Sequence, residues 1–194
     1  MIIKDQKIYD GPFIHQRFAY KYFRDTVNPI GDLVAFIAPA KVEADGMIDQ
    51  EDILKKDYIY SDKMINFCWE IPYIKDSFGA VTFQRLFNTG IADILSKHIG
   101  APVTVDGDDI MVIKEHEQGG VKQNGGKASV SITHIVNNAA IGHTGINVNA
   151  GENAPPFAFS TNLDENATIS FINEVTQFFY WLIRDIQIAT TKTM

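Results

Sequence analysis

The stretch 126–150 reads GKASVSITHIVNNAAIGHTGINVNA and alternates in polarity as two antiparallel strands do. We expect adjacent strands over residues 127–135 and 141–149, joined by a turn over 136–140. With a turn of that length, the apolar rows of both strands lie on one face and the polar rows on the other. The polar face then carries Lys127, Ser129, Ser131, Thr133, His143, Gly145, Asn147 and Asn149.

This polar face has two interpretations. It either meets water, as one face of an antiparallel sheet often does, or it lines a binding site. Its side chains are short hydroxyls and amides with a single Lys and a single His, whereas solvent-facing strands are usually richer in long charged side chains. Short polar groups leave room above the backbone and present donors and acceptors at fixed positions, so the pattern favours a ligand on the sheet.

Length and composition favour one soluble domain spanning residues 1–194. The formal net charge of −7 argues against a broad nucleic-acid surface, because phosphate binding needs a basic field. A single Cys, Cys68, excludes an internal disulfide and a zinc site built on several thiolates. The N-terminus lacks the apolar core of a signal peptide, and the most apolar run, 178–183, is too short to cross a bilayer. We therefore expect a cytoplasmic protein.

Two long amphipathic helices are predicted, over residues 80–98 with Gly100 as the stop, and over 164–189 with Asp164 or Asn166 as the N-cap. Strands are expected at 32–38, 103–105 and 110–113, and short helices near residue 18 and over 49–56. The segment from residue 61 fits a short helix capped by Ser61 or Asp62 and a strand over 65–71 equally well. The polar, glycine-rich residues 115–126 are expected to form a mobile loop. The sequence predicts an α+β fold with a mostly antiparallel sheet flanked by the two long helices.

Three segments of the chain resemble the core of biotin protein ligases and lipoate ligases. They are GDDIMV from Gly107, GKASVSI from Gly126 and IGHTGINVN from Ile141. The resemblance implies a biotin/lipoate ligase-like fold, with Lys127 in the place of the lysine that contacts the carboxylate or acyl-adenylate, and Asp109 in the place of the family's aspartate. The arginine-rich adenylate loop of those enzymes is missing here, and only Gln84-Arg85 stands in its stead.

A second resemblance covers almost the full length. The chain resembles the domain-of-unknown-function 366 family. The resemblance lies in the Tyr-Asp-Gly start, the SDKM segment from Ser61 and the KASVSI strand from Lys127. The resemblance implies that the gene accompanies genes for enzymes that make 7-deazaguanine precursors of queuosine and modified DNA bases. It implies a small planar carboxylate, such as 7-carboxy-7-deazaguanine, as the ligand.

Lys127 and His143 are the candidate catalytic residues: Lys127 would hold the carboxylate, and His143 or a protonated acid would donate a proton. Each also has a plainer interpretation, Lys127 as a surface lysine at a strand end and His143 as a packing residue. The same holds for the substrate-binding candidates, whose acids are also typical of turns, caps and strand edges. The substrate-binding candidates are Asp10, Asp62, Glu70, Gln84, Arg85, Ser129, Ser131, Gly145 and Asn147.

Decarboxylation of 7-carboxy-7-deazaguanine is the favoured function, by a carboxy-lyase that uses no metal and no organic cofactor. One alternative is an ATP-dependent ligase or acyltransferase, in which Lys127 would steady an acyl-adenylate. The other is a non-catalytic ligand-binding protein of the same fold. The expected partner is a small carboxylate or a nucleobase-like molecule, with neither nucleic acid nor membrane, and a homodimer is compatible with the sequence.

Overall fold

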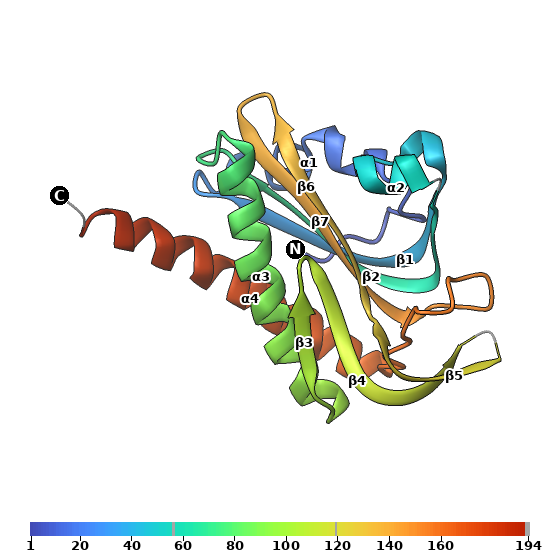
Figure 1. Ribbon diagram of the computed structural model, residues 1–194. Coiled ribbons are helices and arrows are strands. Elements are labelled where there is room, and N and C mark those ends of the chain that lie inside the picture. The colour runs from blue at the N-terminus through green and yellow to red at the C-terminus, as the bar shows by residue number, and fades with distance from the viewer. Residues whose placement is uncertain (56, 119, 193–194) are drawn as a thin grey trace.

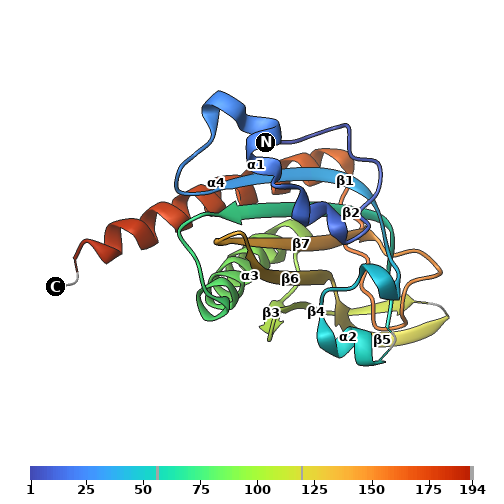
Figure 2. The same ribbon diagram turned by 90° about the horizontal axis from the view of Figure 1, so that it is seen from above.

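A four-stranded antiparallel sheet with strand order β1-β2-β7-β6 forms the centre of the fold (Figures 1 and 2). The computed structural model describes residues 1–55, 57–118 and 120–192. A second antiparallel sheet has the order β3-β4-β5. The strands are β1 (Asp32–Val42), β2 (Ile59–Ile71), β3 (Val103–Asp106), β4 (Asp109–Gln118), β5 (Val121–Lys127), β6 (Ser129–Val136) and β7 (Ala139–Asn149).

Two long helices cover one face of the central sheet, as predicted: α3 (Ser77–Ile99) and α4 (Glu165–Thr190). Both begin at an aspartate whose carboxylate accepts a backbone N–H, at 2.8 Å from Gly79 to Asp76 and at 2.8 Å from Ala167 to Asp164. Gly100 ends α3 in the left-handed conformation that a side chain would strain. The α+β prediction is confirmed, and the C-terminal end of α4 extends beyond the body of the molecule (Figure 1).

The N-terminal segment and short helices cover the opposite face of the central sheet. They are η1 (Pro12–Gln16), α1 (Phe18–Phe23), η2 (Arg24–Thr26), η3 (Ala44–Gly46) and α2 (Gln50–Lys55). Phe13, Ile14 and Phe18 from η1 and α1 are fully buried against Phe36 of β1. Because apolar side chains pack on both faces, β1 is a continuous apolar run, as its sequence predicted.

Residues 61–71, which fitted a helix and a strand equally well, lie in strand β2 between β1 and β7. The expectation of a mobile loop over 115–126 was wrong for the residues described there. β4 and β5 pair across this region, from Gln118 opposite Val121 back to Glu115 opposite Asn124. Pairing meets the hydrogen-bonding needs of the backbone whatever the side chains, so polarity and glycine content did not reveal the strands.

The turn between β6 and β7 overturns the expected division into one apolar and one polar face. It consists of Asn137 and Asn138 alone, both at positive φ, and it places Val136 opposite Ala139. A two-residue turn pairs odd with even positions, so Ser131 lies opposite Thr144 and Ile132 lies opposite His143. Opposed residues share a face, and each face therefore carries one polar and one apolar row.

Among the described residues, none of the helices combines the length and apolarity needed to span a membrane. The cytoplasmic location stays a prediction.

Candidate functional site

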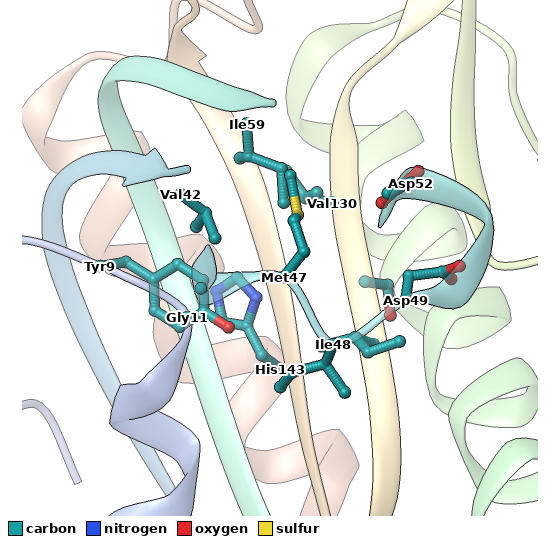
Figure 3. A pocket seen from close by; sticks show the side chains of 13 residues that line it. Tyr9, Gly11, Val42, Met47, Ile48, Asp49, Asp52, Ile59, Val130 and His143 are labelled. Atoms are coloured by element: carbon teal, nitrogen blue, oxygen red, sulfur yellow. The ribbon is translucent and has the colours of Figure 1, made fainter. Parts of the chain in front are cut away.

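Two adjoining hollows lie on the sheet face that carries His143, beneath α2 and the segment that precedes it. Their cavity volumes are about 40 and 60 Å³, so each is a small depression in this face. Asp52, Ile59 and Val130 line both hollows, so the two are parts of one groove. Figure 3 shows the first hollow, where the groove is lined by side chains from the N-terminal segment, α2 and strands β1, β2, β6 and β7.

His143 closes the inner end of the first hollow. Its ring stacks on Tyr9, with centroids 3.7 Å apart and an interplanar angle of 11° (Figure 3). Its Nε2 lies 2.9 Å from Oδ1 of Asn66, and only 1% of the residue is exposed. Burial lowers the pKa of His143 to about 3, so the imidazole is neutral near pH 7. This disfavours the predicted role of His143 as a proton donor.

The second hollow contains Lys127 and Asn147, with Tyr58, Tyr60 and Phe157 on its walls. Asn147 is 4% exposed, and its Oδ1 is fully covered and has no hydrogen-bond partner. The Asn147 backbone is fixed by bonds to Ala128 and Thr161. A buried amide oxygen left without a donor is costly, and because this atom is fully covered a ligand could reach it only after the groups above it move.

Lys127 ends β5 and is not part of the β6–β7 hairpin, contrary to expectation. Its backbone N–H donates to Phe157 and its carbonyl accepts from Phe159, both at 2.8 Å. Its Nζ lies 2.7 Å from Oδ1 of Asp109, the pair that the ligase resemblance singled out. Lys127 and Val130 line the same hollow, although the expected register placed them on opposite faces.

Asp52 on α2 faces the same groove and was not among the candidates identified from the sequence. Burial raises the pKa of Asp52, the nearby Asp49 raises it further, and the Lys127 ammonium opposes both. Asp52 therefore keeps a proton to higher pH than an ordinary aspartate. Only the fold brings it to Lys127, 75 residues away in the chain.

Ser129, Ser131 and Gln84 point to the other side of the sheet, under α3. Ser129 Oγ accepts the N–H of Ile110 at 2.8 Å. Ser131 Oγ accepts from Gln84 Nε2 at 2.8 Å and lies 3.2 Å from Thr144 Oγ1. These side chains form a satisfied network between sheet and helix, so their expected place beside His143 is corrected.

Ser129 and Ser131 are still among the residues that border the two hollows, whereas Arg85, Asp10 and Asp62 line neither. Arg85 pairs with Asp108 at 3.0 Å on the surface. Asp62 accepts a hydrogen bond from Tyr60 at 2.8 Å, and Asp10 is exposed in the turn before Gly11.

Glu70 and Gly145 share the His143 face but do not border the groove. Glu70 lies further along β2, is 4% exposed, and pairs with Arg17 at 2.5 Å. Gly145 is covered by Met64, because a Cβ there would lie 2.2 Å from the Met64 sulfur. The expectation that Gly145 borders open ligand space is therefore wrong.

Within residues 1–55, 57–118 and 120–192, no three His, Cys, Asp or Glu side chains are grouped so that they could hold a metal ion. The prediction of a metal-free and cofactor-free site remains a prediction.

The fold is that of the biotin and lipoate protein ligases. Lipoate-bound LipL1 from P. falciparum matches with a TM-score of 0.55 and 15% identity over 92% of this chain and 59% of that chain. Biotin protein ligase from Aquifex aeolicus matches with a TM-score of 0.53 and 12% identity over 94% and 70%. A protein of unknown function from Pyrococcus horikoshi has a TM-score of 0.83 and 25% identity over 100% and 96%.

The chain belongs to the DUF366 family, a domain of unknown function, whose sequence profile matches residues 1–194. This confirms the family inferred from the sequence. The chain has no significant match among curated protein sequences. The ligases are only 12–15% identical to it, so they establish the fold and leave the chemistry to be argued from the groove.

Proposed function

We propose that the groove binds a small planar carboxylate and removes its carboxyl group as CO₂, with 7-carboxy-7-deazaguanine as the substrate. The observation that carries the proposal is the shared hollow of Lys127 and Asp52. One is a cation able to hold a carboxylate, and the other is an acid whose pKa burial raises. The reaction needs a charged group that holds the carboxylate and an acid that donates a proton, and these two residues are placed to act in those roles.

Binding follows from the groups that line the groove. The ammonium of Lys127 has three N–H donors, and the bond to Asp109 uses one of them. The remaining donors are available to a ligand carboxylate. Ile59 and Val130 offer an apolar surface to a flat ring.

The chemistry needs one proton for each turnover. The five-membered ring of a 7-deazaguanine is electron-rich, so the ring carbon that bears the carboxylate can be protonated. Asp52 supplies this proton, and the bond between the ring and the carboxyl carbon then breaks. Its electron pair returns to the ring and CO₂ leaves. Asp52 regains a proton from solvent, which balances the reaction as RCOO⁻ + H⁺ giving RH + CO₂.

An ATP-dependent ligase is the second candidate. The fold shared with biotin and lipoate ligases favours it, and Lys127 would then contact the acyl-adenylate. The sequence lacks the arginine-rich loop of those enzymes, so we rank this function below decarboxylation.

The test incubates the purified protein with 7-carboxy-7-deazaguanine, with and without ATP, and follows 7-deazaguanine by chromatography. We expect ATP-independent product in the wild type, with losses of about a hundredfold or more in Asp52→Asn and Lys127→Ala. Glu51→Gln, an exposed change on the same helix, is the matched control and should leave turnover unchanged.

Hydroxylamine in the ATP-containing reaction traps an acyl-adenylate as a hydroxamate. Hydroxamate without free 7-deazaguanine would establish the ligase alternative. Binding without either product would leave the protein as a non-catalytic receptor of this fold.

A further inference from the structure

Asn66 is a fully buried polar residue of β2, and its amide can be oriented from its contacts. Its Nδ2 donates to the carbonyl oxygen of Met64 at 3.2 Å. A carbonyl oxygen can only accept, so the NH₂ side of the amide must face Met64. Oδ1 of Asn66 therefore faces His143, 2.9 Å from its Nε2.

This orientation selects one tautomer of His143. Oδ1 of Asn66 can only accept, so the proton of the neutral ring is on Nε2 and Nδ1 keeps a lone pair. Nδ1 has no hydrogen-bond partner, and it is not fully covered by neighbouring atoms. The small exposed part of His143 therefore includes Nδ1, and the hollow that His143 lines is where a ligand can reach it.

Burial keeps the ring of His143 neutral near pH 7. Tyr9 covers its face, and Cys68 lies opposite it on β2. Burial raises the pKa of the Tyr9 phenol and of the Cys68 thiol, so both are uncharged near pH 7. Asp49 and Asp52 are the titratable groups of the α2 side that line the same hollow.

We infer that His143 Nδ1 is a hydrogen-bond acceptor for an N–H of the ligand, and that Asn66 is the positioning residue that creates this acceptor. The identity of the ligand rests on the proposed function. Asp52, Ile59 and Val130 line both hollows, so in this proposal a guanine-like ring with its carboxylate at Lys127 lies with its amino edge towards His143. The site then selects bases that carry a donor on this edge.

The first arm of the test needs no ligand. Nitrogen-15 NMR of the full-length protein, with His143→Gln to assign the signal, reports the tautomer of His143. We expect Nε2–H and no titration between pH 5 and 8. Asn66→Asp puts a carboxylate opposite Nε2 and should bring the His143 titration into that range. Asn66→Leu removes the acceptor and should yield a mixture of tautomers. The internal references are the signals of the other histidines, which should be the same in wild type and in the Asn66 variants. These are His15, His98, His116 and His134.

The second arm compares 7-carboxy-7-deazaguanine with the analogue that lacks the exocyclic 2-amino group. Wild type should bind the amino compound about tenfold more tightly, and Asn66→Leu should lose most of this preference. An Nδ1–H tautomer, or an imidazolium at pH 7, in wild type would overturn the role of Asn66. Equal binding of both compounds with the Nε2–H tautomer present would overturn the ligand contact alone. If neither compound binds, the proposed function and the ligand contact both fail, while the NMR arm still decides the role of Asn66.

Discussion

Tyr9 of the N-terminal segment lies face to face with His143 of β7, with ring centroids 3.7 Å apart. The two residues are 134 positions apart in the chain, and their contact joins the N-terminal segment to the central sheet. Tyr9 is 2% exposed and is held by backbone bonds to Pro39 and Lys41 of β1. This stacked pair forms the closed end of the groove (Figure 3).

Tyr9→Ala should destabilise the protein by about 3–5 kcal/mol, because it removes a buried aromatic ring and leaves a cavity over His143. Tyr9→Phe keeps the ring and should cost far less. Urea unfolding followed by circular dichroism measures both. Tyr20→Ala, at a side chain that is 75% exposed, is the control and should change the free energy of unfolding by less than about 0.5 kcal/mol. A Tyr9→Ala variant as stable as wild type would contradict this account of the closed end.

Acid should destabilise the protein through His143. Its pKa falls from 6.5 to about 3 on folding, so between these values the unfolded chain binds the extra proton. The contribution of His143 to stability is complete above pH 6.5 and declines as the pH falls towards 3, by up to about 1.4 kcal/mol per pH unit. Unfolding of wild type and His143→Gln, measured from pH 7 to 4, should show a steeper decline in wild type. Parallel curves would show that His143 titrates normally.

Lys127→Ala should weaken binding of 7-carboxy-7-deazaguanine by on the order of 2–4 kcal/mol and binding of 7-deazaguanine much less, since only the first has a carboxylate to lose. Stability should change little, because Asp109 is partly exposed and can be hydrated once its partner is gone. Calorimetric titration of both compounds measures the difference, beside a thermal melt. Lys122→Ala, on the same strand and exposed, is the control. Equal losses for the two compounds would remove Lys127 from the carboxylate site.

Gly145→Ala should destabilise the protein by about 1–3 kcal/mol, because the added methyl group meets the Met64 sulfur and the His143 ring. Met64→Ala opens this space, so the Gly145→Ala change should cost less in a Met64→Ala background. A double-mutant cycle by denaturant unfolding measures this coupling. Additive costs would mean that Met64 does not cover Gly145. Gly145→Val, with a larger side chain, is expected to impair folding itself.

Local signals in the sequence determined the elements of the fold. The signals for the two long helices act within one or two helical turns, and the structure confirms them. They are the apolar periodicity of 80–98 and 164–189, the N-cap Asp164 and the helix-ending Gly100. Adjacent antiparallel strands over 127–135 and 141–149 were likewise predicted from alternation, and the strands observed there are 129–136 and 139–149. Lys127, His143 and Asn147 were identified from the hairpin, and the groove includes all three.

Tertiary structure decided how these elements combine. Whether 61–71 formed a helix or a strand depended on the neighbours β1 and β7, which its own residues do not specify. Which rows of the hairpin share a face depended on the length of the turn. Changing the turn by one residue leaves the alternation of each strand unchanged, but it exchanges the rows that lie opposite one another. Asp52 and Tyr9 reach the groove only through contacts distant in sequence, and burial there raises the pKa of Asp52 and lowers that of His143. Desolvation depends on what surrounds a group in space, so the chemistry of the groove is a property of the folded chain.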